Sequence, residues 1–385
     1  MQMLRRIVVI ASVVVTACVA VAPSISAPAA AATAKKKFDP ATIRAIDAIV
    51  NATKNGSGTP GFVVGIWDPK RGTLIKGYGT GDLTDPQSTI GTDDHVRIAS
   101  VTKSFTATAI LQLVAANKLS LDAKLSEFVP DIANGDEITV RQLLDMTAGV
   151  FSYTEDETFV TNYFANPQMP FTAQDALTIV RAHEPDFAPG TSIHYSDSNY
   201  VLLELIAEEV TGEPLGDTIQ SQILDKVGLD ATSYPTTDEM PDPYSHGYLA
   251  QPPSGPRDVT LGNPGVAGGA GAMVSSLEDL HKWAVALGTG ALLPKSLQKE
   301  RLETQPLVST PKLTIAYGLG ITNLNGFLGH DGGILGYATA MFYLPKAKAT
   351  IVVESNSDNV SAQSALWTFI GLASYLYPEQ FPKGL

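Results

Sequence analysis

The chain of 385 residues contains a single cysteine, Cys18, which falls in a segment that we expect the mature protein to lose. The remaining chain then has no thiol nucleophile, no disulfide and no zinc–thiolate site. The six histidines include no pair with the His-x-x-x-His spacing of zinc hydrolases. We therefore expect an activity that needs neither a metal ion nor a cofactor.

Basic residues are also scarce. Acidic residues outnumber Lys and Arg by 39 to 26, and no basic run is longer than the three lysines at 35–37. Neutralising a phosphate backbone needs a basic face, so this composition argues against a nucleic-acid binder. The chain also lacks a G-x-S-x-G elbow and a Walker loop, the markers of the commonest exported serine hydrolase fold and of NTPases.

The first 34 residues follow the order of a secretory signal. Arg5 and Arg6 precede an uninterrupted run of small or apolar residues at 7–22, and small-residue sites such as 32–34 follow. The run is shorter than the roughly 20 residues of a membrane-spanning helix, so we expect no stable membrane span in the mature form. Cleavage after Ala34 would change the formal net charge from −13 to −15.

Cys18 provides an alternative to secretion of a freely released protein after cleavage of the signal segment. Residues 15–18 resemble a bacterial lipoprotein signal, in which the cysteine becomes the lipidated first residue. The apolar run continues through residues 19–22, where a lipoprotein usually turns polar. We therefore expect a secreted, extracytoplasmic protein, with a lipid anchor on Cys18 as the alternative.

Strand patterns lie near both ends of the chain, and helical patterns lie between them. Short neighbouring strands joined by tight turns favour antiparallel pairing. We predict an α/β (α+β) fold, in which one antiparallel sheet built from both chain ends is flanked by helices and carries an inserted all-helical lobe. The predicted domain spans residues 35–385, with a sheet lobe at about 38–112 and 235–385 and a helical lobe at about 113–234. The predicted strands are 61–67, 72–78, 316–322, 337–344 and 350–354, and the clearest predicted helices are 40–53, 101–116, 139–146, 172–183, 200–211 and 362–376.

Proline and glycine are frequent in residues 234–273, which predicts a long loop. Ser275, followed three residues later by Glu278, then predicts the start of a helix by a capping box. The helix would carry Leu280 and Trp283 on one face.

A serine three residues before a lysine occurs at Ser100 and Lys103. The pair alone means little, because Ser296 and Lys299 repeat it. Ser100, however, opens a helix that is apolar or small on every side, which places its N–H at the positive end of the helix dipole. Poor solvation of Lys103, one turn on, would lower its pKa and let it act as a base toward the serine hydroxyl. The alternative is an N-cap serine beside a snorkelling lysine.

Two further motifs follow in order along the chain. Tyr195 stands after a Pro-Gly turn and before a helix, and residues 329–333 (Gly-His-Asp-Gly-Gly) lie between two predicted strands. The ordered set of Ser-x-x-Lys, Tyr-x-Asp and His-x-Gly resembles the serine β-lactamase and penicillin-binding protein superfamily. Within it, the set resembles the class C β-lactamase-like D-alanyl-D-alanine carboxypeptidases and esterases. The resemblance covers about residues 43–354, and the gaps of 95 and 135 residues between the motifs are similar to those of that group.

The resemblance implies a role for each of these residues. Ser100 would be the nucleophile that takes the acyl group, and Lys103 would help to remove its proton. Tyr195, acidified by nearby cations, would pass the proton to the leaving group. The backbone N–H groups of Ser100 and Gly333 would form the oxyanion hole, and Gly332 would let the strand approach the substrate closely.

Two substrate-binding positions depart from the usual pattern, because His330 and Asp197 stand where relatives have lysine and asparagine. A histidine at 330 would make recognition of a substrate carboxylate sensitive to pH near neutrality. An ionised Asp197 cannot donate a hydrogen bond to a substrate carbonyl. It would instead pair with Lys103 and hold it protonated, which favours Tyr195 as the base.

The resemblance implies an exported serine hydrolase that forms an acyl-enzyme, first of all a D-alanyl-D-alanine carboxypeptidase acting on peptidoglycan stem peptides. Its partner would be a small molecule or a peptide: a D-Ala-terminated peptide, an ester or a β-lactam. An esterase or a D-amino-acid amidase of the same fold is one alternative, because the same residues perform acyl transfer whatever flanks the carbonyl. A non-hydrolytic protein that binds penicillin or cell-wall ligands is another.

Overall fold

The computed structural model describes residues 36–85, 87–249, 255–311, 313–358 and 363–381. The predicted export segment, residues 1–34 with Cys18, lies outside the described residues. Contacts group residues 36–385 into one compact unit. Among the described residues, no helix is long and apolar enough to cross a membrane.

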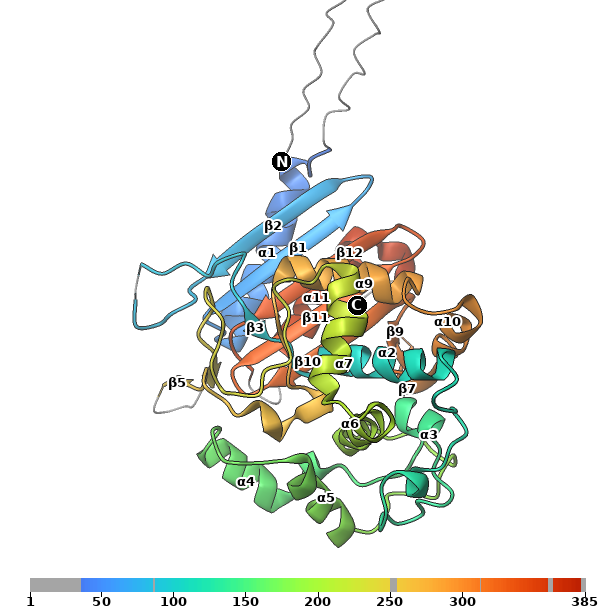
Figure 1. Cartoon of the computed structure of the whole chain (residues 1–385). Coiled ribbons are helices and arrows are strands. Elements are labelled where there is room, and N and C mark those ends of the chain that lie inside the picture. The colour runs from blue at the N-terminus through green and yellow to red at the C-terminus, as the bar shows by residue number, and fades with distance from the viewer. Residues whose placement is uncertain (1–35, 86, 250–254, 312, 359–362, 382–385) are drawn as a thin grey trace, which may run out of the picture. The chain divides into compact units, whose positions relative to one another are not determined.

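One antiparallel sheet of eight strands forms the centre of this unit, in the order β2-β1-β12-β11-β10-β9-β8-β7 (Figure 1). Strands from the two ends of the chain meet inside it, because β1 pairs with β12, with Val64 opposite Val353. The predicted antiparallel sheet built from both chain ends is therefore confirmed. The strands are β1 (Gly61–Asp68), β2 (Gly72–Gly79), β7 (Gln305–Ser309), β8 (Thr314–Tyr317), β9 (Thr322–Leu324), β10 (Phe327–Ile334), β11 (Tyr337–Leu344) and β12 (Ala349–Ser355).

Helices cover both faces of the sheet, which is why the central strands are apolar on both sides. In β12, Ile351 and Val353 pack on one face with α1 (Pro40–Ser57) and α11 (Ser364–Leu376). Val352 faces the other core, which contains α9 (Leu277–Thr289) and α2 (Thr102–Ala115). Alternate residues of a strand point to opposite faces, so one strand contributes to two cores.

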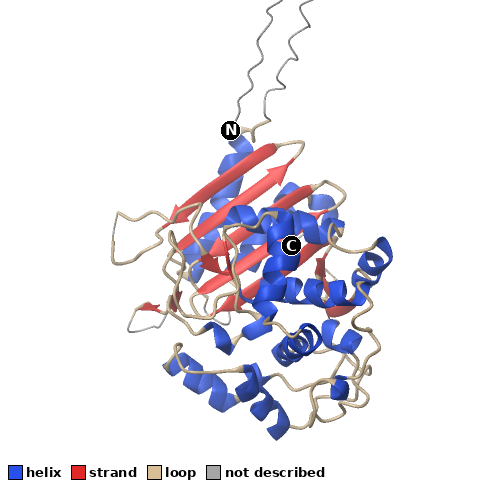
Figure 2. Cartoon of the chain, in the orientation of Figure 1, coloured by secondary structure: helices blue, strands red, loops and turns tan. Residues whose placement is uncertain are grey.

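Helices without sheet strands make up the middle of the chain. Between β3 (Val96–Arg97) and β4 (Tyr248–Leu249) the described residues contain no strand, and Figure 2 shows these helices beside the sheet. The predicted buried helix, α2, is enclosed on nearly every side and packs against α6 and α7. The helices of this region are α3 (Val140–Leu144), α4 (Glu157–Ala165), α5 (Ala173–Ala182), α6 (Asp197–Thr211), α7 (Leu215–Ile219) and α8 (Asp225–Val227).

Three local predictions are wrong. The strand predicted over residues 316–322 is two strands, because a turn at Gly320, with φ +69°, separates β8 from β9. The motif at residues 329–333 lies inside β10 rather than between two strands. Helix α9 begins one residue later than predicted, because the hydroxyl of Ser276, not Ser275, accepts the N–H of Asp279.

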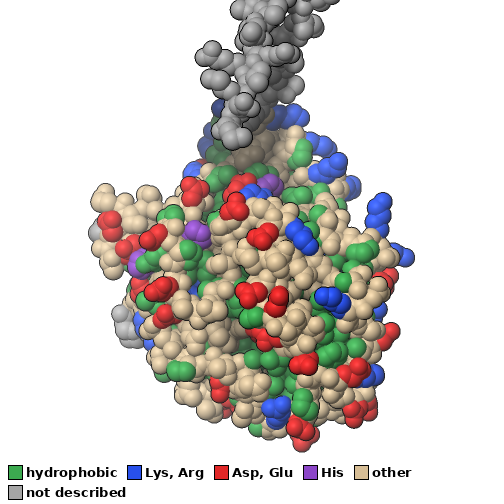
Figure 3. Space-filling view, viewed as in Figure 1, with side chains coloured by type: hydrophobic (Ala, Val, Ile, Leu, Met, Phe, Trp, Pro, Cys, Tyr) green, Lys and Arg blue, Asp and Glu red, His purple; other side chains and the backbone are tan. Residues whose placement is uncertain are grey.

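The predicted loop over residues 234–273 is largely irregular in the described part, with short elements inside it. It contains β4 and β5 (Arg257–Asp258) and the 3₁₀ turn η6 (Gly268–Ala270), and β6 (Val274–Ser275) follows it. Helix α10 (Lys295–Arg301) carries the second Ser-x-x-Lys pair away from the sheet's central strands. On the face seen in Figure 3, acidic and basic side chains are interspersed.

Candidate active site

Ser100 lies in a 3₁₀ turn, η1 (Ala99–Val101), directly before helix α2. Its neighbour Ala99 has φ +48°, a left-handed conformation that is strained for a residue with a side chain. The turn packs against β10, where a Cβ on Gly332 would lie 2.6 Å from the Ser100 nitrogen and 2.5 Å from the Ile98 oxygen. Only glycine at 332 therefore lets the strand approach the segment that carries the serine.

Lys103 projects from the first turn of α2 toward Ser100 and is completely buried. Its Nζ donates to the Ser100 hydroxyl at 3.0 Å, to Asp197 Oδ1 at 2.5 Å and to the backbone oxygen of Ala270 at 2.8 Å. Burial lowers the pKa of Lys103, as the sequence predicts, while the adjacent Asp197 opposes that shift. Three acceptors thus fix the lysine against the serine.

Asp197 is the first residue of α6, and its backbone N–H donates to the Ser152 hydroxyl. One carboxylate oxygen accepts from Lys103, and the other accepts from the Thr154 hydroxyl at 2.8 Å. The predicted pairing of Asp197 with Lys103 is therefore present. Thr154, on the 3₁₀ turn η3 (Tyr153–Glu155), escaped the sequence analysis because nothing in its local pattern links it to residue 197.

A glycine-rich turn holds the third acceptor of Lys103. In η6, the N–H of Gly269 donates to Glu204 Oε2, and the other oxygen of Glu204 accepts from the Tyr234 hydroxyl. Glu204 lies on α6, like Asp197, so a single helix positions both the ion-pair partner and the turn that carries Ala270.

Tyr195 lies just before α6, with its ring 4.9 Å from Lys103 Nζ and edge-on to Tyr317 at 5.9 Å between centroids. Burial and the charge of Asp197 raise the pKa of its phenol well above its ordinary value, although a hydrogen bond with Ser100 lowers it. The expected acidification by cations is therefore wrong. A phenol that keeps its proton is suited to deliver one to a leaving group.

His330 lies in β10 and is buried beside the same tyrosines. Its Nε2 is 3.0 Å from the Tyr317 hydroxyl, and its Nδ1 is 2.5 Å from the backbone oxygen of Asp331. Burial, with the nearby Lys103, lowers the pKa of His330 to about 3. The predicted pH sensitivity near neutrality is therefore not a property of this histidine, which is uncharged there and has both ring nitrogens engaged.

Gly333 is exposed and lines the same cavity as Ser100. Strand β9 pairs with β10 only at residues 327–329, so β9 does not cover this end of β10. The structure thus brings together all seven predicted site residues: Ser100, Lys103, Tyr195, Asp197, His330, Gly332 and Gly333. The assignment of an oxyanion hole to Ser100 and Gly333 remains a prediction.

The cavity beside Ser100 has a volume of about 290 Å³ and a mostly apolar wall. Helix α4, which the sequence analysis missed, supplies Phe159, Tyr163 and Phe164. Its signal was present, since Asp156 is a typical N-cap and these aromatic residues recur at helical spacing. The described lining is Ala99, Ser100, Tyr153, Thr154, Phe159, Val160, Tyr163, Phe164, Asp197, Val266, Ala267, Ala270, Gly271, Gly333, Ile334, Leu335 and Asp358.

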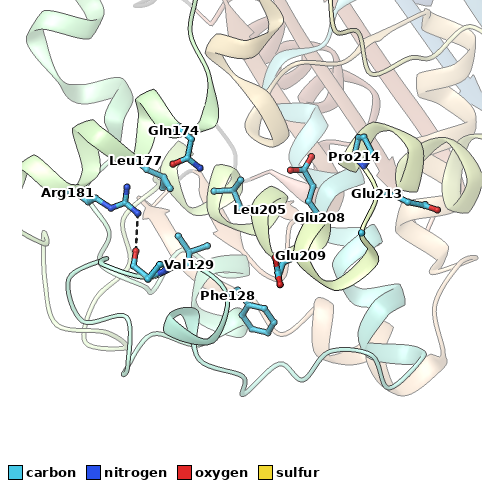
Figure 4. A pocket seen from close by; sticks show the side chains of 12 residues that line it. Phe128, Val129, Gln174, Leu177, Arg181, Leu205, Glu208, Glu209, Glu213 and Pro214 are labelled. Atoms are coloured by element: carbon cyan, nitrogen blue, oxygen red, sulfur yellow. Dashed lines mark hydrogen bonds between the residues drawn. The ribbon is translucent and has the colours of Figure 1, made fainter.

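A second hollow of about 590 Å³, which we call the helical groove, lies between α5, α6 and residues 128–130 (Figure 4). Ser100 does not line it. Across the described residues there is also no group of three or more His, Cys, Asp or Glu side chains that could hold a metal ion.

Comparisons with known proteins agree with this geometry. Residues 46–374 match the family described as Beta-lactamase. A D-stereospecific amidohydrolase from Streptomyces sp. is 32% identical, with 83% of this chain and 96% of that chain covered and a TM-score of 0.74. A D-amino acid amidase from Ochrobactrum anthropi SV3, complexed with L-phenylalanine amide, is 26% identical, with 87% and 97% covered and a TM-score of 0.75.

Among curated proteins, the putative penicillin-binding protein PbpX of Bacillus subtilis (strain 168) is 29% identical over 266 residues. That match covers 68% of this chain and 62% of PbpX. The chain spans about 60% of the length of the curated relatives it matches.

Proposed function

Because the chain belongs to the beta-lactamase family, we propose that its serine hydrolase site cleaves amide bonds of D-amino acid derivatives through an acyl-enzyme on Ser100. The observation that carries the proposal is the hydrogen-bonded set of Ser100, Lys103 and Asp197 beside a largely apolar cavity. Among the described residues, the side chains lining this cavity include carboxylates but no cation. The likeness to the two D-selective amide hydrolases supports the stereochemistry.

The reaction follows from the positions of these groups. Ser100 Oγ attacks the substrate carbonyl carbon, and its proton passes to Lys103, whose pKa is lowered by burial. As the C–N bond breaks, a proton reaches the leaving nitrogen through the neutral phenol of Tyr195, leaving an ester on Ser100. Water then adds to that ester, which releases the acid and restores the serine hydroxyl. The N–H groups of Ser100 and Gly333 would donate hydrogen bonds to the carbonyl oxygen and stabilise the negative charge that develops on it.

A D-alanyl-D-alanine carboxypeptidase is the second candidate, favoured by the likeness to PbpX. It ranks second because a carboxypeptidase must bind a substrate carboxylate, which calls for a cation. His330, which lies beside the leaving-group acid Tyr195, is neutral near pH 7. An amide whose leaving group has no carboxylate fits these neighbours of Tyr195 better.

We also propose that the enzyme acts outside the cytoplasm, close to the cell wall. The proposal of export rests on the charged, apolar and small-residue order of residues 1–34, and the cell wall is proposed from the likeness to the putative penicillin-binding protein PbpX. The mass of the protein recovered from the culture medium would test it, since cleavage near Ala34 removes that segment, whereas a lipid on Cys18 would keep the protein in the membrane fraction.

The substrate class is tested with three compounds and the purified protein. We expect release of ammonia from D-phenylalanine amide, much slower release from the L-enantiomer, and little release of D-alanine from an N-acylated D-Ala-D-Ala peptide. Faster release of D-alanine than of ammonia would make the carboxypeptidase the correct assignment. Intact-mass detection of a penicilloyl adduct that Ser100→Ala abolishes would identify the nucleophile independently of both substrates.

A further inference from the structure

Asp358 is a carboxylate of the cavity to which neither the sequence analysis nor the mechanism assigns a role. It follows β12 and is 6% exposed. Its Oδ1 is buried and has no hydrogen-bond partner among the described residues. A Cβ atom added to Gly333 would collide with its other oxygen, Oδ2, so this carboxylate lies directly beside a predicted oxyanion-hole residue.

In the proposed mechanism, the cavity that Asp358 shares with Ser100 is left for the acyl part of the substrate. Tyr195, which protonates the leaving group in the proposed mechanism, and His330 beside it are not among the described residues that line the cavity. The leaving group therefore occupies the Tyr195 side of Ser100. The acyl part of the substrate remains for the cavity, with Phe159 and Leu335 among its apolar residues.

Nothing in the described lining neutralises Asp358. The lining contains one other carboxylate, Asp197, which is already paired with Lys103. Burial alone raises the pKa of Asp358 to about 7, as expected for a carboxylate without a cationic neighbour. Keeping such a group buried is unfavourable unless a partner arrives with opposite charge.

We propose that Asp358 binds the free α-ammonium group of the substrate's acyl residue, while the apolar wall of the cavity holds that residue's side chain. This assignment rests on the proposed function and narrows its substrate class to amides and peptides of D-amino acids with an unblocked amino group. N-acylated compounds would lose the ion pair and would leave the carboxylate unpaired beside an amide.

The test compares D-phenylalanine p-nitroanilide with its N-acetyl derivative in the wild-type enzyme and in Asp358→Asn. We expect the wild type to prefer the free amine at least tenfold in kcat/KM. In Asp358→Asn, kcat/KM for the free amine should fall at least tenfold, with less than a twofold change for the N-acetyl compound. Equal losses on both substrates would indicate a merely structural role, and an unchanged preference would overturn the assignment.

Glu354→Gln provides a matched control. Glu354 is also a buried carboxylate with an unpaired oxygen, four residues earlier on β12, but it does not line the cavity. Its replacement by the amide should leave the ratio between the two substrates unchanged. A changed ratio in this variant would show that removing any buried carboxylate of this region disturbs the site.

A competition experiment separates the inference from the proposed function. With p-nitrophenyl acetate as substrate, 2-phenylethylamine should inhibit the wild type at least tenfold more strongly than 2-phenylethanol, and Asp358→Asn should remove the difference. If no D-amide is cleaved but this difference is found, the proposed function fails and the ammonium site stands. Equal inhibition of the wild type by the two compounds would contradict the proposed ammonium site.

Discussion

Two hollows among the described residues, the helical groove and the smaller cavity beside Ser100, differ in the groups they gather, and the smaller of these two holds the catalytic groups. The helical groove is lined by residues between 128 and 214, whereas the cavity beside Ser100 gathers residues from positions 99 to 358. In the groove, Glu209, Glu213 and Arg181 are exposed to solvent (Figure 4). In the cavity region, Lys103 and Asp358 are buried.

The difference shows that a side chain becomes reactive when it is buried and when distant parts of the chain bring partners to it. The volume of the hollow does not decide this. An exposed charge keeps its water and gains little from a neighbour, whereas a buried charge changes its pKa or demands a partner. Arg181 and Glu208 of the groove serve local structure, since Arg181 donates to the Pro130 backbone and Glu208 accepts the N–H of Leu215. Substitutions at paired positions in the two hollows test this contrast.

The largest effect is expected for Ser100→Ala. Loss of the nucleophile should lower kcat/KM for D-phenylalanine amide by about 10⁴-fold or more. Glu213→Gln in the helical groove should leave kcat/KM within twofold of the wild-type value. Ammonia release by both variants is the measurement, with thermal melting to confirm that each is folded. Comparable losses of kcat/KM in the two variants would show that the cavity and the helical groove do not differ in their role in catalysis.

A glycine-to-alanine pair gives the next effect. Gly332→Ala places a Cβ 2.6 Å from the Ser100 nitrogen, so the turn η1 must move and kcat should fall by about 10²-fold. Gly212→Ala, at the groove, meets no atom within 4 Å but has φ +72°. That variant should lose about 1 kcal/mol of stability and no activity. The kcat and the free energy of unfolding in urea are measured for both variants. Full activity in Gly332→Ala would contradict the close packing of β10 against the turn that carries Ser100.

The contrast between these glycines also shows which features of the site can be predicted from the sequence. The resemblance of three ordered motifs to a known superfamily identified Ser100, Lys103 and Tyr195, because each motif is a short local pattern that can be read from the sequence. The contacts of Gly332 and the carboxylate of Asp358 depend on which strands pair across nearly 300 residues, and no local pattern encodes that. The predicted acidification of Tyr195 and the predicted pH sensitivity of His330 near neutrality were wrong for a related reason, since both depend on burial within the folded structure.

Asp197→Asn should change the pH profile more than the maximal rate. Asp197 raises the pKa of Lys103 against the effect of burial, so its removal lowers that pKa further. If neutral Lys103 is the base, the acidic limb of kcat/KM moves down by about one pH unit, and activity below the limb rises about tenfold. A pH series from 5 to 9 is the measurement.

An acidic limb of kcat/KM that does not move would favour the alternative in which Lys103 stays charged and Tyr195 is the base. Glu209→Gln in the groove is the control and should leave the profile unchanged.

The smallest effect is a gain in stability from Asp358→Asn. The pKa of Asp358 is about 7 in the folded protein and near 3.8 when unfolded. As pH rises from 4 to 7, the unfolded chain releases this proton while the folded protein keeps it, so the wild type loses stability across that window. The asparagine variant escapes this loss and should be more stable by up to about 4 kcal/mol above pH 7, with no such advantage below pH 4. Thermal melting at pH 4 and pH 8 measures the difference. An advantage that is equal at both pH values would mean that ionisation of the buried Asp358 carboxylate is not its cause. The charged groups of the cavity would then cost the folded protein no more stability than those of the groove.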